Sequence, residues 1–516
     1  MSDEFFFLDE PVLEFGEGQV AQDPHDGLAL FGPTGSVRSI RDHVVIGTNT
    51  GVALWQQWVM EMNSPAACVD VDRQRPWPPY PGYEVAFGAK WPLPYKSYSI
   101  DGEELKHSSF IGERYQRAFA VANHYLEPFA AKIPKLDSLP GLAICVVPDD
   151  VFKNCRMKSY VAHPSDGNES KKLMPEVERQ VEDRKSGQLS LGFDDEEPVS
   201  IEFMSYSPDF RRQIKARVMA YDIPIQIVKE STLLISDQVR NGEPGVNPLS
   251  DRLWNLGTAL FYKSGHKPWR TPWAREGVCY IGLAYRIDDR NDRSACCAAQ
   301  MFLNDGDGVV FVGEFGPWYS SRTGEFHLDQ ESAHDLMRGV IETYNGMDAP
   351  PLREVFLHAR SGINRSEFAG FRSACPDDVS LVGIRVRKDR EGPRLFRHDD
   401  HPEPSKRGKH PVIRGTFWKR TARHGLLFTS GFKPRIATYD GWEVPVPLAI
   451  SIQHGEADIV QVAKDILGLT KLNYNSCQLG ESEPITVKYS DKVGEILLAN
   501  PDLPRKDWKP NFKFYI

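Results

Sequence analysis

The sequence predicts an α/β protein that is built on parallel sheets. Short apolar runs rich in β-branched residues recur along the chain, as in DHVVIGT (42–48), GLAICVV (141–147) and VCYIGLAYRID (278–288). Segments with the apolar spacing of helices lie between them, for example 50–63 and 249–263. Strands that alternate with helices are typical of parallel sheets with crossover helices. At ~100–200 residues per domain, the length of 516 residues predicts at least two domains.

The first half of the chain begins with an acidic segment over residues 1–40, in which 27–33 (GLALFGP) predict a turn-bounded strand. A strand at 42–48 then leads into the helix at 50–63. Residues 111–132 predict a further helix, and 141–147 a short buried strand. Residues 164–200 are polar, charged and poor in aromatic residues, which predicts an insertion within one α/β domain.

The second half continues the alternation. The segment FRRQIKARVMAYDIPIQIVKES (210–231) predicts a helix, a turn and a strand, and the next helix ends before Gly265 and Pro268. A second α/β series starts at VCYIGLAYRID. It continues through strands in VVFVGEF, REVFLHAR, SLVGIRVRK and LLFTSG, with helices at 331–346 and 456–468.

The charge is unevenly distributed along the chain, although its net value is only −9. Residues 1–37 hold eight acidic residues and no lysine or arginine, whereas 404–435 hold nine basic residues and no acidic one. Phe417, Trp418 and Phe428 are interleaved with these bases. The basic stretch therefore predicts a local polyanion site, and a solvated charged face is the alternative. The acidic segment and the insertion are candidate partner surfaces.

Composition excludes several classes of protein. No apolar run reaches the ~18–20 residues that span a bilayer, and the start, MSDEFFFLDE, lacks the basic flank of a signal peptide. The eight cysteines include no C-x-x-C pair and no zinc-site spacing, which predicts reduced core thiols in a cytoplasmic protein.

Four polar residues occur in an order that suits the end of a nucleic-acid strand. Arg211 and Lys215 are four apart and so share one face of the predicted helix. Gln226 lies on the following strand, and Lys263 ends the next helix. Lysine and arginine match a phosphate by charge, and a glutamine amide adds a donor. Each feature alone is more often a solvated surface.

In order and context these segments resemble the MID and PIWI domains of Argonaute proteins. IKARVMAYDIPIQIV resembles the MID helix and strand that hold a guide strand's 5′ phosphate, and LWNLGTALFYKSGHKPW the MID–PIWI junction. LTKLNYNSC and EPITVKYSDKVGEIL resemble the PIWI C-terminal region. The resemblance implies a Rossmann-like MID domain (41–275) and an RNase H-like PIWI domain (276–516). The implied 5′-phosphate ligands are Arg211, Lys215, Gln226 and Lys263.

One position departs from the family pattern. Arg211 stands where many members have a tyrosine or histidine that stacks on the guide's first base, so Phe210 is a candidate substitute.

Length points to a subtype. Only about 270 residues precede CYIGLAYR, too few at ~100–150 residues per domain for N-terminal and PAZ domains as well. The resemblance is therefore to short prokaryotic Argonautes.

Slicing PIWI domains use carboxylates to hold two divalent ions. Here the first position is occupied by Ala284, and the next strand ends in Ala359 and Arg360, while only Asp491 matches the family's last carboxylate. One carboxylate cannot hold two metals, so we expect no slicing. In the alternative, Asp288 or Glu367 completes a rearranged site and the chain is itself a guide-dependent nuclease.

The resemblance implies an RNA-guided defence protein. The guide is RNA, the target is single-stranded plasmid or phage DNA, and an APAZ-containing partner carries the effector, most commonly a TIR NAD hydrolase as in SPARTA-type systems. Sirtuin-like or nuclease effectors are the alternatives. Target binding, with possible oligomerisation, would deplete NAD and stop the infected cell. The candidate duplex-binding residues are Arg385, Arg387, Lys388, Lys406, Arg407, Lys409, Arg414, Lys419, Arg420 and Arg423.

The end of the sequence, WKPNFKFYI, is apolar and predicts a buried tail. In some prokaryotic relatives the terminal carboxylate helps to hold a divalent ion at the guide's 5′ end. The resemblance thus implies Mg²⁺ at Ile516, and an apolar tail docked into the core is the alternative.

A third hypothesis is a small-molecule-binding α/β protein. The sequence has no G-x-G-x-x-G motif after a strand, which argues against it.

Overall fold

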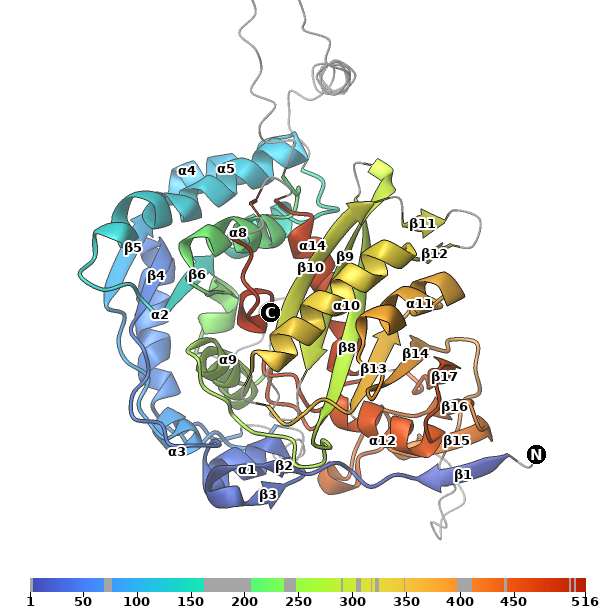
Figure 1. Ribbon diagram of the computed structural model, residues 1–516. Helices are drawn as coiled ribbons and strands as arrows, with labels where there is room; N and C mark the ends of the chain where they lie inside the picture. Colours follow the sequence, from blue (N-terminus) through green and yellow to red (C-terminus); the bar gives the residue numbers. More distant parts are fainter. Residues whose placement is uncertain are drawn as a thin grey trace, which may run out of the picture.

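The computed structural model describes residues 3–68, 77–161, 206–235, 247–288, 291–302, 308–316, 318–320, 324–347, 349–396, 411–439, 443–500, 503–504 and 507–516. Two sheets form the centre of the molecule, and each is covered by helices on both faces (Figure 1). The predicted insertion at 164–200 lies outside the described residues.

The first sheet has four parallel strands in the order β5 (Lys96–Ile100), β4 (His43–Thr48), β6 (Leu142–Val147) and β7 (Ile225–Lys229). Helices α2 (Asn49–Met62) and α9 (Leu249–Lys263) cover one face. Helices α4 (Gly102–Ser109), α5 (Arg114–Glu127) and α8 (Phe210–Val218) cover the other. Short helices α3 (Tyr83–Phe87) and α6 (Asp149–Asn154) complete this part. The predicted strands at 42–48 and 141–147 and their helices are confirmed.

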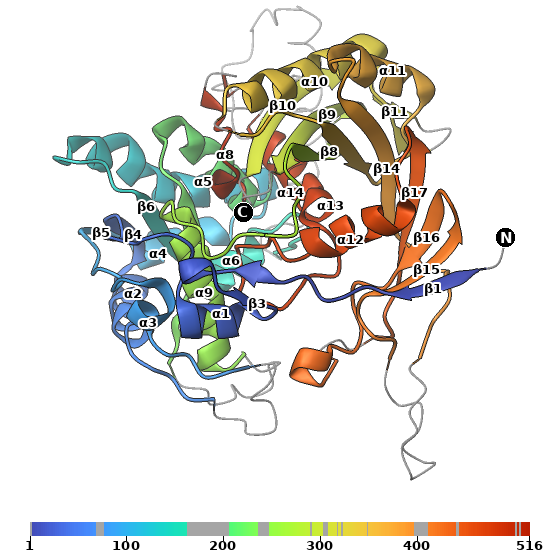
Figure 2. The ribbon, with the colours of Figure 1, turned by 60° about the horizontal axis from the view of Figure 1, so that its bottom comes forward.

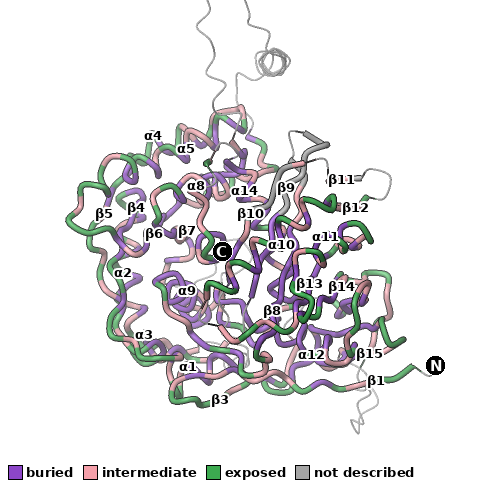
Figure 3. Tube along the Cα trace, viewed as in Figure 1, coloured by how far each residue is buried: buried purple, intermediate pink, exposed green. Residues whose placement is uncertain are grey.

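The apolar runs of β4 and β6 follow from burial on both faces. Val45 and Ile144 contact the cluster that includes α2 and α9, whereas Val44 and Ala143 contact the cluster that includes α5 and α8. Both strands are buried along their whole length, as Figure 3 shows for the centre of this sheet. A strand that is buried on both faces has no polar alternation, which is why these segments are continuously apolar.

The second sheet has nine strands in the order β1-β15-β16-β17-β14-β13-β8-β9-β10. Strand β13 is parallel to both β8 and β14, and the other pairs are antiparallel. This sheet is therefore mixed rather than purely parallel. The strand bounds are β1 (Glu4–Phe7), β8 (Val278–Asp288), β9 (Asn291–Phe302), β10 (Gly308–Gly316), β13 (Glu354–Ala359), β14 (Ser380–Lys388), β15 (Thr416–Thr421), β16 (His424–Leu427) and β17 (Leu448–His454).

Helices lie on both faces of the second sheet (Figure 2). On one side are α10 (Gln330–Asn345) and α11 (Arg365–Ala374), and on the other α12 (Ile459–Leu469), α13 (Ile485–Lys488) and α14 (Ser490–Leu497). Alternation along β8 assigns side chains to these faces, because Ile281 and Leu283 pack with α10 whereas Tyr280 and Ala284 pack in the cluster of α12 to α14. A small hairpin of β11 (Tyr319–Ser320) and β12 (Glu325–Phe326) lies beside this sheet.

The predicted strand at 27–33 is wrong, because most of it lies in helix α1 (Pro24–Phe31). The Asp23 side chain accepts a hydrogen bond from the His25 backbone N–H, Pro24 occupies the first turn, and Gly32 follows at φ +70°. These are strong signals for the start and end of a helix. They outweigh the short apolar run, whose spacing suits either element.

The acidic N-terminal segment joins the two halves of the molecule. It passes from α1, beside α9, through the hairpin of β2 (Leu13–Glu14) and β3 (Val20–Ala21), to β1 at the edge of the second sheet (Figure 1). Strand β1 pairs antiparallel with β15, and Glu4 lies opposite Lys419. Near the other end, the His25 and Trp254 rings are 5.2 Å apart. The segment therefore contacts α9 of the first half and is an edge strand of the second sheet.

The chain end is buried, as predicted. Phe512, Phe514, Tyr515 and Ile516 all lie in the interior, around a single 3₁₀ turn (Phe512–Phe514). In Figure 1 the C-terminus lies between the two sheets, close to α8 and α9. Within the described ranges, no helix combines the length and apolar character needed to cross a membrane.

Candidate functional site

Four cations from different parts of the chain meet beside the C-terminal tail. Helix α8 presents Arg211 and Lys215 on one face, and Asp209 fixes the start of this helix by accepting from the backbone N–H groups of Arg211 and Arg212. Lys263 is the last residue of α9, and Lys492 lies on α14. Lys263, Arg211 and Lys492 all act on the charge of Lys215. We call Arg211, Lys215, Lys263 and Lys492 the cation cluster.

Lys215 is bound to the chain end. Its Nζ donates hydrogen bonds to the backbone oxygens of Ile516 at 2.7 Å and Tyr515 at 3.2 Å. Burial and then the neighbouring charges of Lys263, Arg211 and Lys492 hold the pKa of Lys215 well below its usual value. Among the described residues, the ammonium group has these two main-chain oxygens as partners and no Asp or Glu side chain.

Lys263 lies deepest, with 1% of its surface exposed. Its Nζ donates to Oε1 of Gln226 at 2.8 Å and to the backbone oxygen of Ile225 at 2.9 Å. Burial and the charge of Arg211 lower the pKa of Lys263 to about 7. The structure thus brings Gln226 to the cluster, where its amide oxygen orients the lysine and its amide NH₂ donates to the backbone oxygen of Ile227 at 3.2 Å.

Arg211 and Lys492 lie nearer to solvent. The Arg211 guanidinium is 5.6 Å from the Phe152 ring centre, and burial followed by the charge of Arg156 lowers its pKa. Lys492 is exposed above the Tyr489 ring at 4.6 Å. Sequence reasoning missed Lys492, although it directly follows the retained Asp491. Only the fold shows that α14 packs beside α8.

The proposed stacking role of Phe210 is wrong. Its side chain is 1% exposed and packs against Tyr125 with ring centres 5.3 Å apart, inside the core between α5 and α8. Phe152, beside Arg211, is partly buried at the edge of the cation cluster instead. The helical spacing places Phe210 one residue before Arg211 and therefore on the inward face of α8.

The cation cluster has no acidic side chain as a counter-charge in the described part of the chain. Among the described residues, none of its four members has an Asp or Glu carboxylate within ion-pair distance, and the nearby Glu495 is paired with Arg212 at 2.8 Å. Like charges held together at partial burial destabilise one another unless an anion joins them. A phosphate monoester supplies nearly two negative charges and three acceptor oxygens. The arrangement therefore suits a terminal phosphate.

A second set of predicted residues lies at the ends of β8 and β13. His358 is opposite Gly282, so continuing the parallel register by two residues places Arg360 beside Ala284. The Arg360 guanidinium bonds to Asp491 Oδ2 at 3.2 Å and to Glu483 Oε1 at 3.1 Å. Lys388 adds a second cation, 3.2 Å from Glu483. The retained Asp491 thus contacts a guanidinium.

The alternative metal site would need Glu367 or Asp288 as a further carboxylate ligand. Glu367 is 1% exposed and forms a capping box with Asn364 at the start of α11. It accepts hydrogen bonds from the Tyr285 hydroxyl and from the Leu328 backbone N–H. The side chain of Asp288 lies outside the described part of the chain. Within that part, no three His, Cys, Asp or Glu side chains form a group that could hold a metal ion.

Arg414, predicted to contact a duplex, is a buried structural residue. It is 2% exposed, and its Nε is 2.8 Å from Oε2 of Glu10. Its other donors bond to the Thr470 hydroxyl at 2.6 Å and to backbone oxygens of Thr429 and Glu481. The prediction is wrong for this residue. Glu10 and Arg414 lie far apart in the sequence, but the fold brings them together as a buried ion pair.

The remaining duplex candidates do not form one surface. Alternation along β14 places Arg385 and Arg387 on the side of α10 and α11, and Lys388 on the side of α14. Several bases have partners within the chain: Arg385 with Glu325, Lys388 with Glu483, Lys419 with Glu4, and Arg423 with the backbone oxygens of Ile452 and Gly455. Lys406, Arg407 and Lys409 lie outside the described residues.

Two exposed arginines of this set come together. Arg387 and Arg420 both lower the pKa of His424, after burial as the main cause, so the three side chains are neighbours. Arg420 lies over the Trp418 ring at 5.0 Å. In the described part of the chain, neither arginine has a carboxylate at ion-pair distance. They are the members of the basic stretch and of β14 that remain available to a polyanion.

The surroundings of Ile516 fit a divalent ion poorly. Its backbone oxygen accepts from Lys215, and the other described groups that act on Lys215 are cations. Gln226 Oε1, a nearby neutral side-chain oxygen, accepts from Lys263. Hard divalent ions prefer several carboxylate or carbonyl oxygens. The described protein groups alone therefore do not make a Mg²⁺ site, and no step is assigned to that ion.

No protein-family model matches the sequence, and no curated protein matches it either. Solved structures do match the fold. Clostridium butyricum Argonaute bound to a guide DNA and a 19-mer target DNA superposes with a TM-score of 0.61 at 14% identity, over 100% of this chain and 55% of that one. Aquifex aeolicus Argonaute superposes with a TM-score of 0.54 at 15% identity, over 100% of this chain and 57% of that one. A structure of Aa-Ago with externally bound siRNA superposes with a TM-score of 0.56 at 15% identity, over 99% of this chain and 56% of that one.

These matches confirm the predicted fold class. The chain is α/β, with a parallel sheet and a larger mixed sheet, and its structural neighbours are Argonautes, consistent with MID and PIWI domains. It spans slightly more than half the length of the Argonaute chains that it matches. At this level of identity the likeness concerns the fold, and the function has to be argued from the site.

Proposed function

We propose that this protein is a guide-dependent recognition subunit of the short prokaryotic Argonaute type. It binds the 5′-phosphorylated end of a guide RNA and presents the guide to single-stranded plasmid or phage DNA, whose sequence is read by base pairing. The cation cluster carries this proposal. Four cations without Asp or Glu partners in the described part of the chain converge beside the chain end, and a terminal phosphate is the ligand that best balances them.

The same proposal holds that the protein does not cut its target. Ala284 and Arg360 stand where the resemblance expects metal-binding carboxylates, and Arg360 forms ion pairs with Asp491 and Glu483. A guanidinium that neutralises these carboxylates competes with the divalent ions that slicing requires. The output therefore comes from a second chain: an APAZ-containing effector, most simply a TIR NAD hydrolase, acting in the cytoplasm on target binding.

The guide pocket is tested by replacing its two central lysines. We expect wild-type protein to bind 5′-phosphorylated RNA at least tenfold more tightly than 5′-hydroxyl RNA, and Lys215→Ala with Lys263→Ala to abolish that preference, since each charge-assisted hydrogen bond contributes about 1.5–3 kcal/mol. Dissociation constants for both RNAs and both DNA counterparts give the answer. The matched control is Lys90→Ala with Lys132→Ala, two exposed lysines paired with glutamates.

Equal loss of affinity for both kinds of 5′ end would contradict the assigned pocket. A preference that survives in the double variant would do the same. Thermal melting of each variant separates loss of the pocket from loss of the fold, because removal of the buried Lys263 leaves Gln226 Oε1 without its donor.

Slicing is tested with purified protein, guide, complementary DNA and either Mg²⁺ or Mn²⁺. We expect no guide-dependent product. Cleavage that disappears in Asp491→Ala would overturn the non-slicing half of the proposal, because it would assign catalysis to this PIWI site. Cleavage that persists in that variant points to a contaminating nuclease. The protein is then purified further until that activity is gone, and the assay is repeated.

The effector is tested by co-expression with a candidate APAZ-containing partner, the class of protein that the proposal requires. We expect NAD consumption that needs guide and target together and that falls to background with Lys215→Ala and Lys263→Ala. Constant NAD with degradation of bulk DNA would replace the TIR output with a nuclease. A complex that shows neither response to target would refute the proposed activation.

A further inference from the structure

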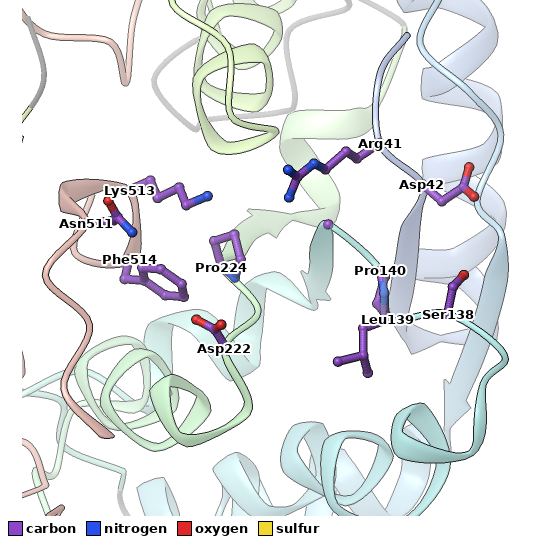
Figure 4. A pocket seen from close by; sticks show the side chains of 11 residues that line it. Arg41, Asp42, Ser138, Leu139, Pro140, Asp222, Pro224, Asn511, Lys513 and Phe514 are labelled. Carbon is purple, nitrogen blue, oxygen red and sulfur yellow. The ribbon is translucent and has the colours of Figure 1, made fainter. Parts of the chain in front are cut away.

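A separate cavity of ≈ 490 Å³ lies between the N-terminal edge of the first sheet and the C-terminal tail. Its walls come from residues 41–42 before β4, residues 138–141 before β6, the turn between α8 and β7, and the 3₁₀ turn of the tail (Figure 4). Cavities of this size lie within the range of small-molecule sites. We call it the tail cavity.

Two basic side chains face each other across the tail cavity. Arg41 points in from the β4 side and Lys513 from the tail, and their charged ends approach above Pro224 (Figure 4). Burial and then the charge of Arg41 lower the pKa of Lys513, whereas the charge of Asp222 opposes that shift. Within the described ranges, neither has a carboxylate at ion-pair distance.

The acidic residues of the wall offset this pair only in part. The charge of Asp222 acts on Lys513, but Asp222 is 3.2 Å from Lys509, which is outside the cavity lining, and its exposed position weakens its effect. The Asp42 carboxylate points away from the gap between Arg41 and Lys513 in Figure 4. The space between the two cations is therefore positive and is open to a single anionic group.

The local backbone leaves room for the exposed Arg41 side chain. A Cβ on Gly141 would come within 2.6 Å of the Arg41 Cβ, so glycine allows the arginine stem to cross the start of β6. The Gly141 backbone N–H also donates to the Asp42 oxygen at 2.9 Å. Leu139, Pro224 and Phe514 supply an apolar wall beside the cations, which suits a sugar or base attached to the anion.

We propose that the tail cavity binds the phosphate of a free nucleoside monophosphate between Arg41 and Lys513, with its nucleoside against Leu139, Pro224 and Phe514. This site is distinct from the cation cluster. Inorganic phosphate shares the anionic chemistry, and comparison of the two ligands shows whether the nucleoside contributes.

The two sites share structural elements. Lys513 lies two residues before Tyr515, whose backbone oxygen binds Lys215, and one 3₁₀ turn joins them through the bond from the Tyr515 N–H to the Phe512 oxygen at 3.0 Å. Pro224 likewise precedes Ile225 and Gln226, the partners of Lys263. A ligand that fixes Lys513 therefore restrains the tail that holds Lys215. This coupling rests on the proposed guide pocket, whereas the binding itself does not.

The cavity is tested by calorimetric titration of the full-length protein, loaded with 5′-phosphorylated guide, with AMP, GMP and inorganic phosphate. We expect one equivalent of nucleotide to bind and the affinity to fall at least about tenfold in R41Q/K513Q, as for loss of charge-assisted hydrogen bonds. R38Q is the matched control, since Arg38 is exposed three residues before Arg41 and outside the lining. It should bind like wild type.

Absence of binding at millimolar nucleotide, or equal affinity in wild type and R41Q/K513Q, overturns the site. Phosphate that binds as tightly as AMP overturns the nucleoside part. Guide dissociation is then followed with and without saturating AMP, and we expect it to slow. An unchanged rate refutes the coupling while the site stands. Protein that binds AMP but retains no guide refutes the proposed function and leaves the cavity assignment intact.

Discussion

At the scale of single residues, burial decides which charged side chains can act. Lys263 is buried against Gln226 and has no Asp or Glu partner among the described residues, which is why we propose it as a phosphate ligand. Arg414 is equally buried, but it is fully occupied by Glu10 and by backbone oxygens. Both are basic residues in the sequence. The difference lies in whether the surrounding fold supplies an acceptor that matches the charge.

The lowered pKa of Lys263 gives guide binding a pH dependence. Its pKa of about 7 means that the free protein loses this charge above neutral pH, so binding of a phosphate must restore the proton. We expect affinity for 5′-phosphorylated guide to weaken from pH 7 to 9 by up to about tenfold per unit. Lys263→Arg keeps its charge throughout and should flatten the profile.

The same shift affects stability in the opposite direction. The unfolded chain keeps the lysine proton up to its usual pKa of 10.5, so the free protein gains stability as pH rises from about 7 toward that value. For the prediction on guide binding, titrations of 5′-hydroxyl guide serve as the reference for general effects of pH. If wild type and Lys263→Arg showed the same pH profile for phosphorylated guide, the assigned role of Lys263 would be contradicted.

At the scale of elements, the N-terminal segment works as a brace between the two halves. Glu10 lies between two buried cations, 2.8 Å from Arg414 Nε and 2.8 Å from Lys471 Nζ. Lys471 also donates to the backbone oxygen of Gln22 in the same segment. At its edge β1 pairs with β15, where Phe5 stacks on Trp418 at 5.1 Å. Three acidic residues of the start thus pair with described bases of the basic stretch: Glu4 with Lys419, Glu10 with Arg414, and Asp26 with Arg435.

Glu10→Gln tests this brace. It leaves Arg414 and Lys471 buried without their shared carboxylate, and breaking a buried ion pair on one side costs about 3–5 kcal/mol. We expect a marked drop in the free energy of unfolding by denaturant. Glu4→Gln is the matched control, because the Glu4–Lys419 pair is exposed and contributes at most about 1 kcal/mol. Equal effects of the two changes would contradict the brace.

Acid should weaken the same contact. Burial alone would raise the pKa of Glu10, but Arg414 and Lys471 outweigh it and lower the pKa to about 2, from an ordinary value of 4.5. The stabilisation is thus fully present above pH 4.5 and is lost as pH falls through 2. Glu10→Gln should lack that part of the acid dependence.

At the scale of the whole molecule, the proposed phosphate pocket and the two exposed arginines Arg387 and Arg420 lie in different places. The cation cluster joins α8, α9, α14 and the tail, so it spans the junction between the two sheets. Arg387 and Arg420 lie on the second sheet, on the face opposite α12. A guide held at one end and a target strand drawn to the other sheet fit this separation.

The contribution of these two arginines is measured by salt dependence. Each phosphate that the protein no longer neutralises should reduce the slope of log affinity against log salt by about 0.7–0.9. We expect R387Q/R420Q to reduce the salt slope of target binding by about one to two units. The preference for a 5′ phosphate should stay unchanged. R338Q is the control, because Arg338 is exposed on α10 and paired with Asp335. An unchanged slope would return both arginines to a solvated face.

The sequence by itself predicted much of the local structure and three of the four members of the cation cluster. Buried strands such as β4 and β6 were readable because both faces demand apolar residues. Helical spacing paired Arg211 with Lys215, whereas Gln226 and Lys263 were added by their order along the chain and the resemblance to Argonautes. Strands β1 and β9 were missed, since their pairing depends on distant partners rather than on a pattern of their own.

Only the tertiary structure decided which charges are satisfied. Ion pairs join residues that are far apart in sequence, as Glu10 joins Arg414 and Arg360 joins Asp491, and no periodicity records them. It likewise brought Lys492 to the cation cluster and set Arg41 against Lys513. A charge is read from the sequence, but its energy depends on burial and on its neighbours in space, which the fold alone supplies.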